Sequence, residues 1–439
     1  MSKSVNFIVQ PGGTLQGEIR VPGDKSISHR SIMLGSLAKG STHVKGFLEA
    51  EDALATLQAF RDMGVVIEGP EKGELTIQGV GLQGLTAPSK PLYLGNSGTS
   101  MRLLCGLLAG QVFDSTLTGD DSLSKRPMKR VINPLAEMGA KIDSTAAGTS
   151  PLKVKSGNAL KGIDYVMPMA SAQVKSCVLL AGLYAEGETS VTEPAPTRDH
   201  TERMLAGFGY PVKRQGNKVT VDSKGSLTAC DIDVPSDISS AAFFLVGASI
   251  AENSEVLLKH VGLNPTRTGV LDILKLMGAN IEISNQKSVG GEPVGDIRVK
   301  SSQLQGIDIP PELVPLAIDE FPVLFIAAAC AKGQTVLTDA EELRVKECDR
   351  IQVMADGLQV LGVDAVATDD GMIIQGGQLG GGEVISHGDH RIAMAFAIAG
   401  LRAQSEITIL DCTNVNTSFP PFVELAAGLG LSIESKEIS

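Results

Sequence analysis

The feature that most constrains this chain is a short helix-ending phrase that recurs six times, at intervals of about 70 to 85 residues. In each copy a helical pattern stops at a glycine and a β-type run follows. This order is typical of a helix that ends in a left-handed cap. The six glycines are Gly64, Gly139, Gly209, Gly278, Gly362 and Gly430. The chain is therefore expected to consist of six equivalent units.

Two further phrases recur in the same register. One is an Ala- and Gly-rich helix, apolar nearly all round, that runs into a short turn and a β-branched strand; such a helix is expected to be buried and closely packed. The other is a strand–turn–strand segment, seen in the match between residues 12–26 and residues 223–239, which puts the first strand pair at the N-terminus. The helical phrase occupies residues 26–44, 98–111, 171–191, 239–256, 319–337 and 389–409.

Each unit therefore reads as strand, strand, buried helix, strand, amphipathic helix, strand. Six copies predict an α/β protein of two similar domains, each with three units whose buried helices lie side by side. One alternative is a single α/β sheet whose glycines mark unrelated turns, but three phrases recurring in one order argue against it. Another is a solenoid, which is disfavoured because there are six units and no obvious capping repeat.

Composition narrows the class of partner and the compartment. The 439 residues carry 38 Lys and Arg against 50 Asp and Glu, a net charge of −12, with no Trp and 4% aromatic residues. Such a chain lacks the basic face and stacking platforms of a nucleic-acid binder. The six cysteines are scattered without a C-x-x-C motif, the N-terminus lacks a signal-peptide core, and no apolar run reaches the roughly 18 residues of a membrane helix. We expect a cytoplasmic protein with no membrane partner.

The residues just before the six buried helices differ from unit to unit, which suggests that function lies there. Helix N-termini attract anions, and added Lys or Arg makes a phosphate or carboxylate site. Four of the six starts carry such a cation, and more lie in residues 125–127, at Arg198 and in residues 344–350. Each segment alone could be a capped or solvated helix start. Their joint occurrence at equivalent positions favours a small, multiply anionic ligand in a cleft. The starts are residues 24–30, 95–102, 170–175, 236–239, 318–320 and 388–391.

Several common site motifs are absent from the sequence. There is no H-E-x-x-H or clustered His/Cys pattern, so no metal is expected. There is also no phosphate-binding G-x-x-x-x-G-K-[ST], no G-x-G-x-x-G that opens a dinucleotide-binding unit, and no G-x-S-x-G of a serine hydrolase.

The segments LGNSGTSMR (94–102) and RVKECDRI (344–351) closely resemble the two signatures of the EPSP synthase family of enolpyruvyl transferases. VPGDKSISHR, SKRP, MASAQVKS and GDHRIAM agree with the same family, in family order, from about residue 9 to residue 434. The resemblance implies two domains of three βαβαββ units each, with buried parallel helices as an inside-out α/β barrel, and a cleft between the domains. The first would be residues 25–240, and the second residues 1–24 and 241–439.

The resemblance also implies a reaction. The enolpyruvyl group of phosphoenolpyruvate would be transferred to the 5-hydroxyl of shikimate 3-phosphate, releasing phosphate by addition and elimination through a tetrahedral intermediate. This is a step toward chorismate and the aromatic amino acids. Both substrates carry phosphate and carboxylate groups, which suits the cationic helix starts. No metal or organic cofactor is implied, and we expect a monomer.

Carried over motif by motif, the resemblance assigns roles to residues. Asp319 would be the base for the 5-hydroxyl and Glu347 the proton shuttle at the methylene carbon, with Lys25 and His390 assisting. Shikimate 3-phosphate would be held by Lys25, Ser26, Arg30, Ser171, Ala172, Gln173, Arg198, Asp319 and Lys346. Phosphoenolpyruvate would be held by Lys25, Asn96, Gly98, Thr99, Arg126, Gln173, Arg350 and Arg391. In this family glyphosate occupies the phosphoenolpyruvate pocket, and Gly98 would leave room for it.

The chain departs from the family pattern at three places. Ala172 stands where many members have Ser, Thr197-Arg198 replace a Ser and a Tyr, and the Lys that precedes the last Phe-Pro is missing before Phe419. One rival is UDP-N-acetylglucosamine enolpyruvyl transferase, but residues 112–128 lack the cysteine of its mobile loop. The acidic balance argues against an RNA 3′-phosphate cyclase. A non-catalytic anion-binding repeat protein would not need Asp319 or Glu347.

Overall fold

The computed structural model describes residues 4–438, which form two compact units. The N-terminal unit comprises Gly23–Val234 together with Ser288–Glu292. The C-terminal unit comprises the chain up to Pro22, Pro235–Lys287 and the chain from Pro293 onward.

The division differs in detail from the sequence-based boundary at residue 240. That boundary falls inside helix α7 (Ile238–Ile250), which belongs wholly to the C-terminal unit. The backbone N–H of Asp237, the residue before this helix, donates to the Pro22 carbonyl at 2.9 Å. A hydrogen-bonded helix moves as one body, so residues 235–240 belong with the C-terminal unit and not, as the sequence suggested, with the first domain.

Twelve α-helices among the described residues alternate between buried and amphipathic along the chain, as the sequence predicted. Every one of the six helix-ending glycines has a positive φ, between 78° and 120°, which confirms the left-handed caps. No helix of residues 4–438 is long and apolar enough to cross a bilayer. The buried helices are α1 (Lys25–Leu37), α3 (Gly98–Ala109), α5 (Ala172–Gly182), α7, α9 (Phe321–Cys330) and α11 (His390–Ala399). The amphipathic helices are α2 (Glu51–Asp62), α4 (Lys129–Glu137), α6 (His200–Gly207), α8 (Gly269–Leu276), α10 (Arg350–Val360) and α12 (Phe422–Leu429).

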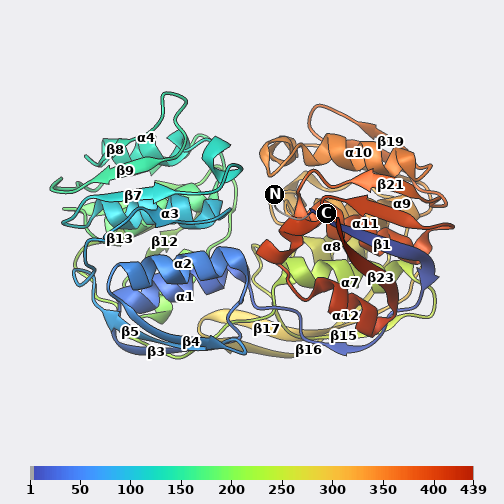
Figure 1. The fold of residues 1–439 in the computed structure, drawn as a ribbon, viewed down its shortest axis with the longest axis horizontal. Coiled ribbons are helices and arrows are strands. Elements are labelled where there is room, and N and C mark those ends of the chain that lie inside the picture. Colours follow the sequence, from blue (N-terminus) through green and yellow to red (C-terminus); the bar gives the residue numbers. More distant parts are fainter. Residues whose placement is uncertain (1–3, 439) are drawn as a thin grey trace. The chain divides into compact units, whose positions relative to one another are not determined.

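The N-terminal unit holds three small mixed sheets, ordered β14-β3-β5-β4, β6-β7-β9-β8 and β10-β11-β13-β12. A buried helix connects the parallel strands β6 and β7, and another connects β10 and β11. In Figure 1 helices α1 and α2 cover the sheet of β3, β4 and β5. The strands are β3 (Lys39–Lys45), β4 (Val66–Glu71), β5 (Glu74–Val80), β6 (Leu92–Tyr93), β7 (Ser115–Thr118), β8 (Lys141–Asp143), β9 (Leu152–Lys155), β10 (Asp164–Val166), β11 (Glu188–Thr192), β12 (Lys213–Gln215), β13 (Lys218–Asp222) and β14 (Ile232–Asp233).

The C-terminal unit also holds three sheets, ordered β16-β17-β15-β2, β18-β20-β19 and β21-β22-β1-β23. The strands from the two ends of the chain, β1 and β23, pair antiparallel and lie side by side in Figure 1. The strands are β1 (Ser4–Gly13), β2 (Gln16–Ile19), β15 (Glu255–Gly262), β16 (Asn280–Val289), β17 (Glu292–Lys300), β18 (Gln334–Leu337), β19 (Asp364–Ala367), β20 (Met372–Gln375), β21 (Gly382–Ile385), β22 (Ile407–Leu410) and β23 (Leu431–Ile438). Short 3₁₀ turns are η1 (Leu123–Lys125), η2 (Pro311–Leu313), η3 (Glu341–Val345), η4 (Gly400–Arg402) and η5 (Thr413–Thr417).

The two matching strand–turn–strand segments are exchanged between repeats. Strand β2, which directly precedes α1, pairs in parallel with β15, which follows α7. Strand β14, which directly precedes α7, pairs in parallel with β3, which follows α1. Each segment therefore completes the sheet of the other repeat. The sequence-based expectation of one strand pair at the N-terminus is accordingly wrong, because β1 and β2 lie in different sheets.

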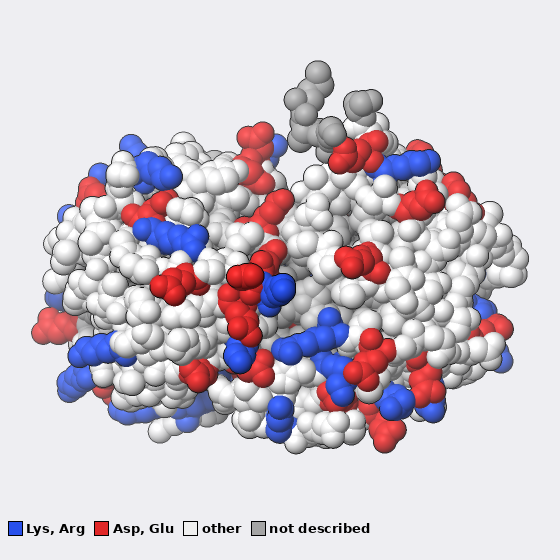
Figure 2. All heavy atoms as spheres, turned by 60° about the horizontal axis from the view of Figure 1, so that its bottom comes forward, with Lys and Arg blue, Asp and Glu red and all other residues white. Residues whose placement is uncertain are grey.

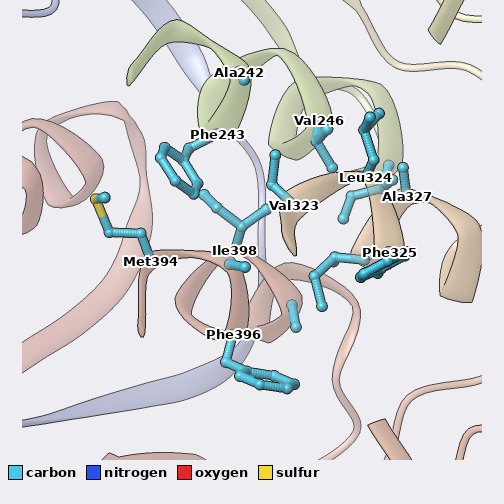
Figure 3. Packing of buried hydrophobic residues seen from close by; sticks show 14 of the residues in the cluster. Ala242, Phe243, Val246, Val323, Leu324, Phe325, Ala327, Met394, Phe396 and Ile398 are labelled. Carbon is cyan, nitrogen blue, oxygen red and sulfur yellow. The ribbon is translucent and has the colours of Figure 1, made fainter. Parts of the chain in front are cut away.

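Buried helices pack against one another inside each unit. In the C-terminal unit, side chains of α7, α9 and α11, among them Phe243, Leu324 and Ile398, meet in one apolar cluster (Figure 3). In the N-terminal unit α3 and α5 approach so closely that a Cβ placed on Gly106 would lie 2.0 Å from the carbonyl oxygen of Cys177. The small residues noted in the sequence thus set the distance between helix backbones.

Replacing Gly106 by alanine is expected to lower the free energy of unfolding by at least about 1–3 kcal/mol, because α3 and α5 must separate to admit the methyl group. Urea unfolding followed by circular dichroism measures the change. The control is Gly428→Ala in α12, where an added Cβ meets no atom within 4 Å. That variant should match or exceed the wild-type stability, since alanine favours the helix by roughly 0.5–1 kcal/mol. Equal stability of the two variants would contradict the tight approach of α3 and α5.

Candidate anion-binding and acid–base site

Side-chain caps define the starts of five of the six buried helices. Asp24 accepts from the Ile27 N–H at 2.8 Å, Ser97 from Ser100, Ser171 from Val174, Asp237 from Ser239 and Asp389 from Arg391. Helix α9 begins without one, after Glu320. The simpler interpretation, that these segments are capped helix starts, is therefore correct for the capping residues. It does not account for the cations beside them.

The predicted residues divide between the two units. The N-terminal unit holds Lys25, Ser26, Arg30, Asn96, Gly98, Thr99, Arg126, Ser171, Ala172, Gln173 and Arg198. The C-terminal unit holds Asp319, Lys346, Glu347, Arg350, His390 and Arg391.

At the start of α1, Lys25 pairs with Asp52 of α2, their Nζ and Oδ2 atoms 3.1 Å apart. One turn on, the buried Arg30 donates from Nε to Thr201 at 2.7 Å and from Nη2 to Ser176 at 2.9 Å. Its Nη1 donates to the Ser26 carbonyl at 2.9 Å. Burial lowers the pKa of Arg30 to about 10, so the guanidinium stays charged at neutral pH. Arg30 thus ties α1 to α5 and α6.

At the start of α3, Asn96 connects a carboxylate to a guanidinium. Its Nδ2 donates to Asp120 at 2.8 Å, and its Oδ1 accepts from Arg126 at 2.6 Å. Beside it, a Cβ on Gly98 would lie 3.1 Å from Nη1 of Arg102 and 3.2 Å from Nη1 of Arg126. Two guanidinium groups therefore border Gly98, the first residue of the helix, which has no side chain, and this arrangement is suited to an anion.

Gln173 joins the starts of α3 and α5. Its Nε2 donates to Thr99 Oγ1 at 3.1 Å, and its Oε1 accepts from Arg102. Ala172, which follows the capping Ser171, contributes its backbone to the first turn of α5. Thr99 and Gln173, both predicted to hold phosphoenolpyruvate, therefore lie together.

In the C-terminal unit, Arg350 gathers three carboxylates. Its Nε donates to Asp389 at 2.7 Å, its Nη2 to Glu347 at 2.7 Å, and its Nη1 to Asp319 at 3.4 Å. Arg350 and Asp389 are buried, with side chains 1% and 0% exposed. Burial alone would lower the pKa of Arg350, but attraction to Asp389, Glu347 and Asp319 outweighs it and raises the pKa above its ordinary value. The guanidinium is permanently charged and holds both predicted acid–base carboxylates.

Asp319 also contacts Lys346 and Arg391. The Nζ of Lys346 lies 3.6 Å from Asp319 Oδ1 and 2.7 Å from Glu342 Oε1. Arg391 donates from Nη1 to the backbone carbonyl of Asp319 at 3.1 Å. His390 is buried at the first position of α11. Asp319 and Glu347 therefore lie beside three cations, which Asp389, Glu342 and Glu320 also contact, in a site that can hold an anion and move a proton.

The side chains that orient these groups were not predicted from the sequence. Asp52, Asp120 and Asp389 hold Lys25, Asn96 and Arg350 respectively. Asp389 could have been found, because it occupies the capping position of its helix within a conspicuous motif. Asp52 and Asp120 carry no such signal in the sequence.

Two observations concern other kinds of site. No group of three or more His, Cys, Asp or Glu suited to a metal ion occurs within residues 4–438. On the face drawn in Figure 2, basic and acidic side chains are interspersed, without one continuous basic surface.

Comparisons with known proteins agree along the length of the chain. The family model described as EPSP synthase (3-phosphoshikimate 1-carboxyvinyltransferase) matches residues 9–425. The 3-phosphoshikimate 1-carboxyvinyltransferase of Methylococcus capsulatus is 69% identical over 432 residues, covering 98% of this chain and 99% of that protein. The Hydrogenovibrio crunogenus protein of the same name is 66% identical over 445 residues, covering 100% of both.

Solved structures agree as well. A structure of EPSP synthase from Acinetobacter baumannii matches with a TM-score of 0.91 at 61% identity, covering 98% of this chain and 100% of that one. A second structure of EPSP synthase from the same organism gives a TM-score of 0.89 at 60% identity, covering 99% and 100%. The family match, the identities and the shared fold together show that this chain belongs to the EPSP synthase (3-phosphoshikimate 1-carboxyvinyltransferase) family.

Proposed function

We propose that this protein transfers the enolpyruvyl group of phosphoenolpyruvate to the 5-hydroxyl of shikimate 3-phosphate and releases phosphate, on the way to chorismate and the aromatic amino acids. The observation that carries the proposal is the grouping of Asp319 and Glu347 around the buried Arg350. This grouping places two potential proton carriers beside a fixed positive charge. Family membership supplies the substrates.

The binding roles follow the motifs. Shikimate 3-phosphate engages Lys25, Ser26, Arg30, Ser171, Ala172, Gln173, Arg198, Asp319 and Lys346. Phosphoenolpyruvate engages Lys25, Asn96, Gly98, Thr99, Arg126, Gln173, Arg350 and Arg391. In support, one hydrogen bond joins Arg126 to Asn96 and another joins Gln173 to Thr99, so these side chains already hold one another in place. Preorganised donors lose less entropy when an anion binds.

The reaction then proceeds in two stages. Asp319 takes the proton of the 5-hydroxyl as the hydroxyl oxygen bonds to the central carbon of phosphoenolpyruvate. Glu347, which enters this step protonated, delivers its proton to the methylene carbon. The product is a tetrahedral phospho-ketal. In the second stage the new methyl group returns a proton to Glu347 and the carbon–oxygen bond to phosphate breaks. The leaving phosphate takes the proton that Asp319 accepted, so both carboxyl groups return to their starting states. Lys25 and His390 assist the proton transfers, and Arg350 holds both carboxylates in place.

The same family resemblance extends to architecture and context. Each unit is proposed to be an inside-out α/β barrel, with its buried helices parallel and its small sheets outside. The protein is proposed to be a cytoplasmic monomer that works without cofactor, metal, nucleic acid or membrane. Size-exclusion chromatography with light scattering tests the monomer, for which the mass should equal the 45.8 kDa of one chain.

Phosphate release tests the reaction. Purified protein should release phosphate from phosphoenolpyruvate when shikimate 3-phosphate is present and should not do so with UDP-N-acetylglucosamine as acceptor. Release with the sugar nucleotide alone would mean that the acceptor is wrong. If folded protein binds phosphoenolpyruvate and shikimate 3-phosphate but releases no phosphate with either acceptor, the result would favour a non-catalytic anion-binding protein.

Gly98 makes a prediction about inhibition. We expect glyphosate to inhibit the wild-type protein and Gly98→Ala to raise its inhibition constant by at least about tenfold, because the methyl group would crowd the guanidinium groups of Arg102 and Arg126. Steady-state inhibition against phosphoenolpyruvate measures both constants. The control Gly428→Ala, remote from these arginines in sequence and in the other unit, should keep the wild-type value. Equal inhibition of wild type and Gly98→Ala would contradict the assignment of this position to the phosphoenolpyruvate pocket.

A further inference from the structure

We infer that Lys175 is a positioning residue for the loop that carries Arg198, and that it thereby supports binding of shikimate 3-phosphate and not of phosphoenolpyruvate. The inference rests on the proposed function, because that function assigns Arg198 to the phosphate of shikimate 3-phosphate. The side chain of Lys175 contacts Glu193, Glu202 and Thr197, none of which is assigned to a ligand.

Lys175 is a charged side chain near the N-terminal end of a buried helix. It lies on α5, and its side chain is 0% exposed. Its Nζ lies 2.8 Å from Oε1 of Glu193, which is also 0% exposed, and 2.8 Å from Oε1 of Glu202. One ammonium group therefore joins two carboxylates from outside its own helix.

Glu193 connects Lys175 to the loop that carries Arg198. Its second oxygen, Oε2, accepts from the backbone N–H of Thr197 at 2.9 Å and from the Thr197 hydroxyl. Lys175 Nζ donates to the Thr197 carbonyl at 3.5 Å. The backbone of Glu193 is held in turn, since Asn217 Nδ2 donates to its carbonyl at 2.7 Å. The residue before Arg198 is thus fixed through its N–H, its hydroxyl and its carbonyl.

The other end of the loop is fixed separately. Asp199, which directly follows Arg198, pairs with Arg203 at 2.8 Å and with Arg214 at 3.6 Å. Arg198 lies between these two supports. An arginine held at both neighbours loses less conformational freedom on binding than one in an untethered loop.

The position of Lys175 on α5 relates it to the proposed phosphate site. Residues 171–173, assigned to the phosphate of shikimate 3-phosphate, form the start of α5, and Lys175 lies in the next turn of the same helix. A single helix therefore carries one part of the proposed phosphate site and positions the other. Burying a charged triad is costly compared with an apolar core, so a purely structural need does not explain it.

The first test is Lys175→Met, which keeps the length of the side chain and removes the charge. We expect KM for shikimate 3-phosphate to rise by about tenfold or more and KM for phosphoenolpyruvate to stay within about twofold. Titration calorimetry with shikimate 3-phosphate alone should show a matching loss of affinity. Equal changes in both KM values, or none in either, would overturn the inference.

A milder variant covers the case in which Lys175→Met does not fold. Thr197→Val leaves the three buried charges intact and removes the loop hydroxyl that Glu193 accepts from. It should raise KM for shikimate 3-phosphate severalfold while the melting temperature stays near that of the wild type. The matched control is Leu205→Ala, a 0% exposed residue of the neighbouring α6, which should lower the melting temperature without a selective change in KM.

Failure of the inference and failure of the proposed function are distinguishable. A wild-type protein that binds shikimate 3-phosphate but releases no phosphate contradicts the proposed function alone. Lys175→Met and Thr197→Val proteins that bind shikimate 3-phosphate as tightly as the wild type contradict the inference alone.

Discussion

Replacing Arg350 by methionine is expected to abolish phosphate release and to lower the free energy of unfolding by about 3–5 kcal/mol. The guanidinium is buried and donates to Asp389, Glu347 and Asp319. Without it, the buried Asp389 carboxylate loses its charged partner, and the two proposed proton carriers lose the group that orients them. A buried charge without a partner is among the most destabilising changes that a single substitution makes.

Denaturant unfolding and the phosphate-release assay measure the two effects separately. Arg298→Met is the matched control, since Arg298 also pairs with a carboxylate, Glu255, at 2.6 Å but its side chain is 40% exposed. An exposed pair contributes no more than about 1 kcal/mol, so this control should keep nearly full stability and activity. Arg350→Met protein as stable and active as Arg298→Met would mean that the carboxylate cluster does not depend on its arginine.

The repeat was predictable from sequence because it is local. A left-handed cap requires glycine at one position, and a buried helix requires small or apolar residues on all its faces, so both leave a pattern that can be read along the chain. All six capping glycines and all six buried helices lie where the pattern placed them.

The pairing of strands was not predictable in the same way. Strands β2 and β14 come from segments of similar sequence, so each suits the other's sheet as well as its own. Which partner a strand takes depends on how the chain crosses between units, and that is a long-range property with no local signal.

The site shows the same difference between features with a local sequence signal and features set by long-range contacts. Cations at helix starts stand out in the sequence because they interrupt an otherwise apolar repeat, and most predicted residues lie at such starts. Their partners do not stand out. Asp52 supports Lys25 from a different helix, and nothing in the sequence around Lys175 indicates that this side chain is fully buried. Burial of a charged side chain is set by tertiary packing, which spacing alone does not reveal.

Replacing the carboxylates of Asp319 and Glu347 is expected to cause a large loss of kcat. Asp319→Asn and Glu347→Gln are each expected to lower kcat by about 10²–10⁴-fold, because an amide cannot accept and release the proton that the step requires. Both substitutions keep the shape of the side chain and an oxygen that can accept from Arg350, so the KM values should change far less than kcat. The control is Glu342→Gln, whose side chain is 47% exposed and contacts Lys346 from outside the cluster, and which should stay close to wild type.

The two variants should also differ from each other in a way that separates their roles. If Glu347 serves the methylene carbon, Glu347→Gln should lose the incorporation of solvent deuterium into the methylene group of phosphoenolpyruvate during turnover, measured by NMR. Asp319→Asn acts at the hydroxyl, so the deuterium that enters per turnover should remain comparable with wild type even as turnover slows. A reversal of this pattern would exchange the two assignments. Full activity in both variants would remove acid–base catalysis from this cluster, since the carboxylates would then serve only to hold Arg350 in place.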